Sequence, residues 1–246
     1  MMQIIDTTEL KPPRVLLYGT EGIGKTTFGA RSPSPLFILT EDGTAGQQIK
    51  HLPLCRSWDA LSEAIDFVRY SDMTGFQTIV IDSVSGVEQL IHAQVCRDSG
   101  KESIAEARGG FGKGYTFAAT CMLKLLDRLD AIRDEQGLSV VMLAHAATEK
   151  VDDPERESYT RHALRVHKEA ANVLTAWADV VGFACRKVRI RTDEASGRKI
   201  GASVGDDAAS RVLRLVGGPA CVAKNRYGLP EEMPLDAAAF WSAVGG

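Results

Sequence analysis

The sequence lacks the features that mark secreted, membrane-spanning and zinc-binding proteins. Its five cysteines are scattered and form no Cys-x-x-Cys pair, which argues against a zinc ribbon and a disulfide framework. It holds no run of about 18 apolar residues, the length that a membrane-spanning helix needs. Residues 1–13 have no apolar core behind basic residues, so we expect no signal peptide. The odd number of thiols suits a reducing compartment, and we expect a soluble, cytoplasmic protein without a membrane partner.

Aromatic residues and net charge are also scarce. Aromatic residues make up 7% of the chain, too few for a broad base-stacking platform. The net charge is -3, so a nucleic-acid contact would have to use a local basic patch. The 246 residues are 44% hydrophobic and can bury a substantial core. We expect one domain over residues 1–246, with a short leader at 1–13 and a β-rich C-terminal part at 179–234.

Strand and helix patterns alternate along the first two thirds of the chain. We expect strands at 14–18, 36–40, 78–82 and 138–144, and helices at 25–30, 58–69, 87–98, 115–134 and 167–177. This order predicts an α/β fold with a central, mainly parallel sheet flanked by helices.

The remaining segments are predicted from turn residues and alternation. The glycine-rich segment 109–114 is not expected inside a regular element, and the polar segment 148–160 predicts a mobile loop. Alternation predicts a C-terminal β-hairpin extension, then a strand and a turn; the ranges are 180–191 and 198–204 for the hairpin, 211–216 for the strand and 224–230 for the turn.

The segment between the first expected strand and helix fits the eight-position phosphate-loop pattern without a mismatch. We call residues 19–26 the phosphate loop. With the threonine that follows, the expected nucleotide ligands are Gly19, Thr20, Glu21, Gly22, Ile23, Gly24, Lys25, Thr26 and Thr27. The glycines let the backbone N–H groups point at phosphate oxygens, and the helix N-terminus adds partial positive charge. Lys25 is expected to reach the β- and γ-phosphates and Thr26 to bind magnesium, so the sequence predicts ATP and Mg²⁺ as cofactors.

Three expected strands end in polar side chains that should meet beside the phosphate loop, because the carboxyl ends of parallel strands share an edge. Asp82 ends the strand TIVID and is expected to hold magnesium, usually through water. Glu41 follows LFILT and is our candidate general base, with Glu21 and Asp42 as competitors. His145 ends the fourth strand and is the candidate sensor of the γ-phosphate.

After the phosphate loop, the motifs FILTE, VIDSV, VVMLAHA and AKNRYG resemble, in this order, the RecA-like P-loop ATPases, which include recombinases and ring helicases. The phrases GFGKGY, AWADVVGFA and KNRYGLPEEMP are similar to phage-encoded members, some of which are single-strand annealing proteins or minimal recombinases. The resemblance runs over residues 14–234. It implies that Glu41 is the catalytic glutamate and that Asp82 and Ser83 form the magnesium-site strand. His145 stands where recombinases usually carry Gln.

The resemblance also implies a contact between subunits. Lys224 and Arg226 match a basic pair that reaches the ATP of the neighbouring subunit in the RecA-like group. An Arg inserted from a neighbour neutralises the charge that develops on the transferred phosphoryl group, and it makes hydrolysis depend on assembly. We therefore expect self-assembly into a ring or filament with ATP at the subunit interfaces.

In RecA-like recombinases, the loops after the third and fourth strands bind single-stranded DNA. The corresponding segments are 100–115 and 146–165, and the candidate DNA contacts are Arg108, Lys113, Lys150, Arg161 and Arg165. Phe111 and Tyr115 are available for stacking, whereas acidic residues at 149–157 would repel phosphate. Further basic residues share one face of the expected hairpin: Lys187, Arg189 and Arg191.

Together these features predict a DNA-dependent, phage-type recombination ATPase that anneals or exchanges strands in the bacterial host cytoplasm. A single-strand binding protein is a further candidate partner. The alternative is a nucleotide-dependent switch or assembly ATPase that does not bind DNA, which the acidic residues at 152–157 favour. A small-molecule kinase would need an acceptor pocket and an Arg-rich lid, and the hairpin after the fourth strand and the KNRYG turn argue against it. A helicase is a further alternative, but the chain shows no visible priming or linker domain.

Overall fold

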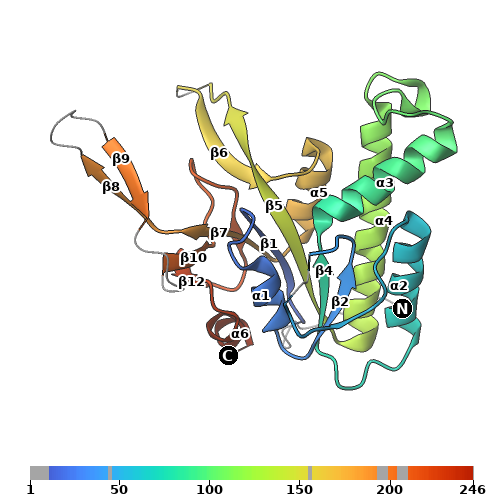
Figure 1. The fold of residues 1–246 in the computed structure, drawn as a ribbon, viewed down its shortest axis with the longest axis horizontal. Helices are drawn as coiled ribbons and strands as arrows, with labels where there is room; N and C mark the ends of the chain where they lie inside the picture. Colours follow the sequence, from blue (N-terminus) through green and yellow to red (C-terminus); the bar gives the residue numbers. More distant parts are fainter. Residues whose placement is uncertain (1–10, 44–45, 155–156, 193–198, 204–209, 246) are drawn as a thin grey trace, which may run out of the picture.

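The computed structural model describes residues 11–43, 46–154, 157–192, 199–203 and 210–245, with side chains omitted for 188–203. The described part of the chain forms a ten-stranded sheet whose main path has the order β12-β10-β7-β1-β5-β4-β2-β3 (Figure 1). The parallel strands are β1 (Arg14–Gly19), β2 (Pro35–Leu39), β3 (Lys50–His51), β4 (Thr78–Asp82), β5 (Ser139–Val151) and β7 (Val180–Arg186). This confirms the predicted α/β class with a mainly parallel sheet.

The remaining strands of the sheet pair antiparallel. β6 (Tyr159–Leu164) pairs with β5, and β10 (Arg211–Arg214) lies between β7 and β12 (Glu232–Pro234). The short β11 (Lys224–Asn225) pairs with the start of β7, within the segment that we predicted as a turn. The β-rich C-terminal part therefore widens the sheet beside β1.

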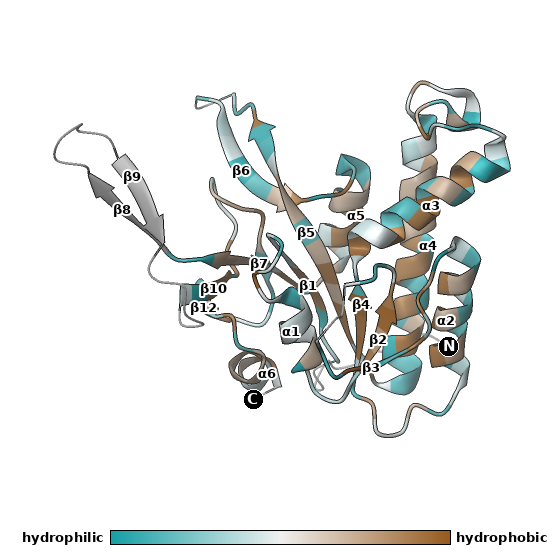
Figure 2. Ribbon diagram, viewed as in Figure 1, coloured by the Kyte–Doolittle hydropathy of each residue, from teal (hydrophilic) through white to brown (hydrophobic). Residues whose placement is uncertain are grey.

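Helices cover both faces of the sheet and create two apolar cores. One face carries α2 (Trp58–Tyr70), α3 (Val84–Ser99), α4 (Lys113–Gln136) and α5 (Lys168–Trp177), and the other carries α1 (Lys25–Ala30) and α6 (Ala237–Gly245). Alternate residues of β1 enter different cores: Leu16 and Tyr18 face α2–α5, whereas Val15 and Leu17 face α1 and α6. Figure 2 shows the strands between the helices as the most hydrophobic part of the ribbon. None of the described helices is both long and apolar enough to cross a membrane.

The prediction of a loop at 148–160 is wrong for the two ends of that range, 148–151 and 159–160, which are strands. β5 continues to Val151 and pairs with β6, from Ala146 opposite Leu164 to Val151 opposite Tyr159. The polar sequence forms strands because opposite charges face each other: Arg161 Nε lies 2.6 Å from the Glu149 carboxylate in the paired register. The resulting β5–β6 hairpin extends away from the sheet and is hydrophilic along its outer part (Figures 1 and 2).

Other element boundaries also differ from the predictions. A short helical turn (Ala107–Gly109) occupies part of the glycine-rich segment, and α4 begins at Lys113, so Gly114 is helical. The alternating run 180–191 divides into β7 and β8 (Val188–Thr192), and β8 pairs with β9 (Lys199–Ser203) as the predicted hairpin. The residues that connect the two strands of this hairpin, 193–198, lie outside the described residues, as do the side chains of Arg189 and Arg191. Lys187 forms an ion pair with Glu232, at 2.8 Å.

Candidate functional site

The phosphate loop links the carboxyl end of β1 to α1 (Figure 1). Gly22 and Gly24 have φ of 70° and 114°, values that favour glycine because it has no Cβ. A Cβ at Gly19 would lie 2.5 Å from the carbonyl oxygen of Ala184 on β7, so the loop also requires glycine there for close packing. These positions explain physically why the loop sequence is rich in glycine.

Lys25 is buried beneath the phosphate loop. Its ammonium group donates hydrogen bonds to the carbonyl oxygens of Gly19 and Thr20, both at 2.9 Å. Burial lowers its pKa, and attraction to the carboxylates of Asp82 and Glu21 acts in the opposite direction. The buried cation is therefore held at the base of the loop, where a phosphate would complete its solvation.

Thr26 and Asp82 are brought together from α1 and β4. The Thr26 hydroxyl donates to Asp82 Oδ2 at 2.8 Å. Burial raises the pKa of Asp82, while this hydrogen bond acts to lower it. A hydroxyl and a carboxylate are oxygen ligands of the kind that Mg²⁺ prefers, and Mg²⁺ usually takes its other ligands from water and substrate phosphates. The pair therefore fits the predicted magnesium site.

Glu41, Ser83 and His145 form a polar cluster at the carboxyl ends of β2, β4 and β5. Ser83 Oγ donates to Glu41 Oε1 at 2.6 Å, and His145 Nε2 lies 3.1 Å from Glu41 Oε2. Burial acts to raise the pKa of Glu41, but the hydrogen bonds from Ser83 and His145 outweigh it, and the pKa is lowered. The cluster therefore keeps the Glu41 carboxylate charged and fixes its direction.

These side chains line one cavity of about 320 Å³. The lining residues are Glu21, Gly22, Gly24, Lys25, Thr26, Thr27, Glu41, Gly43, Asp82, His145 and Arg211. Sequence reasoning missed Gly43 and Arg211. The run RVLR predicts only a strand, and nothing in it indicates that its first residue reaches the phosphate loop. Asp42, a competitor for the role of base, is exposed and does not line the cavity.

Glu21, the other competitor, points out of the loop toward solvent. Its carboxylate lies 3.4 Å from Arg165 Nη1, and its side chain is 75% exposed. Arg165 follows β6 and donates its backbone N–H to the His145 carbonyl at 2.9 Å. This candidate DNA contact therefore lies at the rim of the cavity.

The other candidate DNA contacts are spread along the two predicted segments. Lys150 and Arg161 lie on the β5–β6 hairpin and pair with Asp152 and Glu149. Arg108 stacks over Phe117 at 4.0 Å and lies 3.8 Å from Asp98.

The start of α4 presents two exposed side chains. Lys113 is exposed, and Phe111, with φ of 53°, is fully exposed at the end of the glycine-rich loop. Tyr115, by contrast, stacks on His167 at 4.0 Å within the chain. Phe111 is thus the freer of the two predicted stacking residues.

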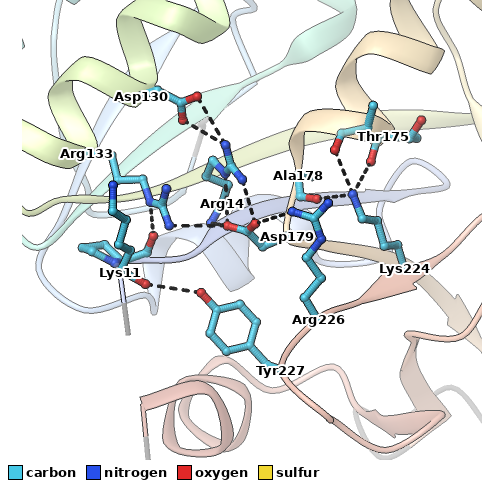
Figure 3. A network of polar contacts seen from close by, with 12 residues as sticks. Lys11, Arg14, Asp130, Arg133, Thr175, Ala178, Asp179, Lys224, Arg226 and Tyr227 are labelled. Atoms are coloured by element: carbon cyan, nitrogen blue, oxygen red, sulfur yellow. Dashed lines mark hydrogen bonds and ion pairs between the residues drawn. The ribbon is translucent and has the colours of Figure 1, made fainter. Parts of the chain in front are cut away.

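Lys224 and Arg226 lie at the opposite edge of the sheet from the phosphate loop, around the starts of β1 and β7 (Figure 3). The six residues of β1 separate the two edges by about 17 Å. Arg226 is half exposed and forms an ion pair with Asp179 at 3.2 Å. Asp179 also pairs with Arg14 at 2.8 Å and with Arg133 at 3.7 Å. Neither basic residue reaches the cavity of its own subunit.

Lys224 has an intramolecular role that the sequence does not reveal. Its ammonium group donates to the carbonyl oxygens of Thr175, Ala176 and Ala178, at 3.0, 2.8 and 2.7 Å (Figure 3). These are carbonyls at the C-terminal end of α5, where a cation is favoured. Burial lowers the pKa of the Lys224 ammonium group, and repulsion from Arg226 lowers it further.

We expect Lys224→Met to lower the free energy of unfolding by about 1–2 kcal/mol, because three helix carbonyls lose a charged donor. Urea denaturation would measure the change. Lys168→Met, at the exposed start of the same helix, is the matched control and should leave stability nearly unchanged. Equal stability of the two variants would contradict this structural role.

The chain is similar in sequence to a family of AAA domains and to a prophage-derived protein. The sequence profile of the AAA_24 family, described as "AAA domain", matches residues 11–227. The SPbeta prophage-derived uncharacterized protein YorG of Bacillus subtilis (strain 168) is 24% identical over 139 residues, which cover 55% of this chain and 42% of that protein. The chain thus aligns with less than half of its relative's length. A solved structure described as the RadB recombinase is 12% identical, with a TM-score of 0.49 over 90% of this chain and 84% of that one.

Proposed function

Because the chain belongs to the AAA_24 family of AAA domains, we propose that it is an ATPase that binds ATP with Mg²⁺ in the cavity beside the phosphate loop. The observation that carries this proposal is the convergence of Lys25, Thr26, Asp82, Glu41 and His145 on one cavity from three different strands and a helix. A buried cation, an oxygen pair suited to magnesium and an oriented carboxylate are the parts that phosphoryl transfer to water requires.

The reaction forms a bond between a water oxygen and the γ-phosphorus and breaks the bond to the β–γ bridging oxygen. Glu41 accepts the proton of the attacking water, and Ser83 and His145 hold its carboxylate in place. Lys25 neutralises charge on the β- and γ-phosphates. Thr26 and Asp82 would hold Mg²⁺, which would supply positive charge to offset that of the phosphates. The products are ADP and phosphate.

Ser83→Ala should shift the acid limb of the turnover profile to higher pH. The Ser83 hydroxyl stabilises the charged form of Glu41, so its loss raises the lowered pKa of Glu41, and the base is protonated at a higher pH. The measurement is kcat across the acid range.

Ser83 also caps α3 by accepting a hydrogen bond from the Gly86 N–H, so folding must be checked in parallel. Ser83→Thr retains a hydroxyl and should restore the profile. Ser85→Ala, which removes a hydroxyl that donates to the Arg165 carbonyl, is the control. A limb that stays fixed or moves to lower pH would contradict the role of Ser83.

The finer proposal is a RecA-like, phage-type ATPase that assembles on single-stranded DNA for annealing or strand exchange, with ATP at subunit interfaces. The continuity of β5 supports it, because the strand passes from His145 beside the cavity directly into the β5–β6 hairpin. A DNA contact on the hairpin and a nucleotide in the cavity would thus share one strand. A single-strand binding protein is a candidate partner of such an assembly.

The alternative is a nucleotide-dependent switch that does not bind DNA. The pairing of Lys150 and Arg161 with acidic residues of their own hairpin favours it, because paired cations have less charge to offer phosphate. Steady-state ATP hydrolysis at low salt, with and without single-stranded DNA, tests both readings, with Lys25→Ala as the inactive control. A several-fold increase in ATP turnover on addition of DNA supports the ATPase that assembles on single-stranded DNA. ATP turnover that is unchanged by DNA supports the switch that does not bind DNA.

Phe111→Ala should weaken binding of a fluorescent single-stranded oligonucleotide about tenfold, because base–aromatic stacking contributes about 1–3 kcal/mol per base. Phe111 has the exposure that such stacking needs. Phe67→Ala removes a half-exposed ring on α2 and serves as the matched control. Equal binding by both variants would remove Phe111 from the DNA site.

A further inference from the structure

Arg211 is a basic residue that lines the cavity and that the mechanism above leaves unused. It is the first residue of β10, which runs antiparallel to β7, with Arg211 opposite Arg186 and Leu213 opposite Ala184. Because Ala184 of β7 pairs with Gly19 of the phosphate loop, the start of β10 lies at the same edge of the sheet as that loop. The topology thus brings a guanidinium group to the loop from a strand nearly 200 positions further along the chain.

The guanidinium lies against the phosphate loop itself. Arg211 Nη1 is 3.2 Å from the position that a Cβ on Gly24 would occupy, and Leu235 Cδ2 is 3.7 Å from the same point. The Leu235 N–H donates to the Arg211 carbonyl at 3.0 Å, which fixes the backbone on this side of the cavity. Gly24 therefore leaves room for the guanidinium in addition to providing the loop's positive φ.

The hydrogen-bonding capacity of Arg211 is not satisfied within the described residues. Its Nε is buried without a hydrogen-bond partner, and no acidic side chain in the described part of the chain pairs with it. Other arginines of the fold, such as Arg14 and Arg128, are paired with carboxylates. Buried donors normally have partners, so a guanidinium whose Nε has none among the described residues, in a cavity that also holds Lys25, points to an anionic ligand.

The position across the sheet identifies which part of the ligand Arg211 faces. Glu41, Asp82 and His145 come from β2, β4 and β5, on one side of β1, whereas β7 and β10 lie on the other side. The two groups therefore approach the phosphate loop from opposite sides. Because the hydrolytic residues surround the terminal phosphate, Arg211 is left to the phosphates nearer the nucleoside.

We propose that Arg211 binds the α- and β-phosphates of the nucleotide within its own subunit and so contributes to the affinity for both ADP and ATP. This inference rests on the proposed nucleotide site. It assigns to Arg211 a binding role that does not depend on a neighbouring subunit, on DNA or on turnover.

The test is equilibrium binding of fluorescent ADP, with ATP competition, to the full chain and its variants. Arg211→Gln should weaken binding of both nucleotides about 10- to 100-fold, because a charge-assisted, bidentate contact is lost. Arg211→Lys keeps the positive charge without the fork geometry of the guanidinium, so its nucleotide affinity should lie between those of the wild type and Arg211→Gln. Arg214→Ala is the matched control, since Arg214 lies three residues along the same strand, projects to the other face and is close to Glu232.

The outcomes separate the inference from the proposed function. Failure of the wild-type chain to bind either nucleotide would overturn the nucleotide site as a whole. Tight binding by the wild type that persists in folded Arg211→Gln would overturn the inference and leave the nucleotide site intact. A loss confined to ATP would also contradict it, because that result would assign Arg211 to the γ-phosphate. Circular dichroism and thermal unfolding establish that each variant is folded.

Discussion

Glu41→Gln is expected to reduce ATP turnover by about 10²–10⁴-fold while ATP binding persists, because the amide keeps the size of the side chain but cannot accept a proton. The Ser83 hydroxyl can still donate to the amide oxygen, so the variant should keep the arrangement of the cluster. Single-turnover hydrolysis measures the chemical step, and fluorescent nucleotide binding measures retention of the site.

Two acidic neighbours provide the controls for Glu41. Asp42→Asn alters the next, exposed residue, and Glu21→Gln alters the outward-pointing acid of the phosphate loop. Both should retain turnover within a few-fold of the wild type. If either control lost turnover while Glu41→Gln remained active, the general base would have to be reassigned to that residue.

Arg226→Ala is expected to reduce turnover in assembled protein by about 10³–10⁵-fold, the effect of removing an arginine finger supplied by a neighbour. Within one chain, Arg226 lies at the edge of the sheet opposite the phosphate loop, so any catalytic effect must act on another subunit's ATP. The fold should tolerate the change, because Asp179 keeps its pairs with Arg14 and Arg133.

Mixing two inactive variants distinguishes this role from a structural one. A random mixture of Arg226→Ala and Glu41→Gln subunits would contain intact base and intact finger at about one interface in four. Turnover should therefore reappear on mixing. If the mixture shows no ATP turnover although each variant is folded and assembled, Arg226 does not act on the ATP of a neighbouring subunit. A mixture of Lys224→Met and Glu41→Gln subunits is the comparison for the Arg226→Ala mixture. Lys224 is chosen because its ammonium group already donates hydrogen bonds to helix carbonyls of its own chain.

The phosphate loop and the polar strand ends can be predicted from sequence because each is recognised from a short, continuous stretch of residues. A buried apolar strand identifies its own carboxyl end, and parallel strands bring these ends to one edge. Asp82, Glu41 and His145 therefore lie together although they are more than 100 positions apart at the extremes. Only the order of the strands in the sheet had to be supplied by the fold.

Arg211, Lys224 and the β5–β6 hairpin could not be predicted because their surroundings depend on pairing across the chain. Arg211 reaches the cavity only because β10 runs antiparallel to β7. The basic turn sequence does not indicate whether the Lys224 side chain is exposed to solvent or hydrogen-bonded to the C-terminal end of α5. The hairpin is polar on its outer part, so its strands lack the apolar alternation that would have identified them.

The continuous pairing of β5 with β6 beyond His145 makes the hairpin a stiff lever with its fulcrum beside the proposed nucleotide site. From His145 to Val151 the strand runs about 20 Å without a flexible joint. A tilt of about 10° at the His145–Glu41 contact would move the end of the hairpin by about 3–4 Å, several times the displacement at the fulcrum itself. If the chain binds nucleotide and single-stranded DNA as proposed, loss of one phosphate would be amplified mechanically into a displacement of about one nucleotide's rise, about 3.4 Å.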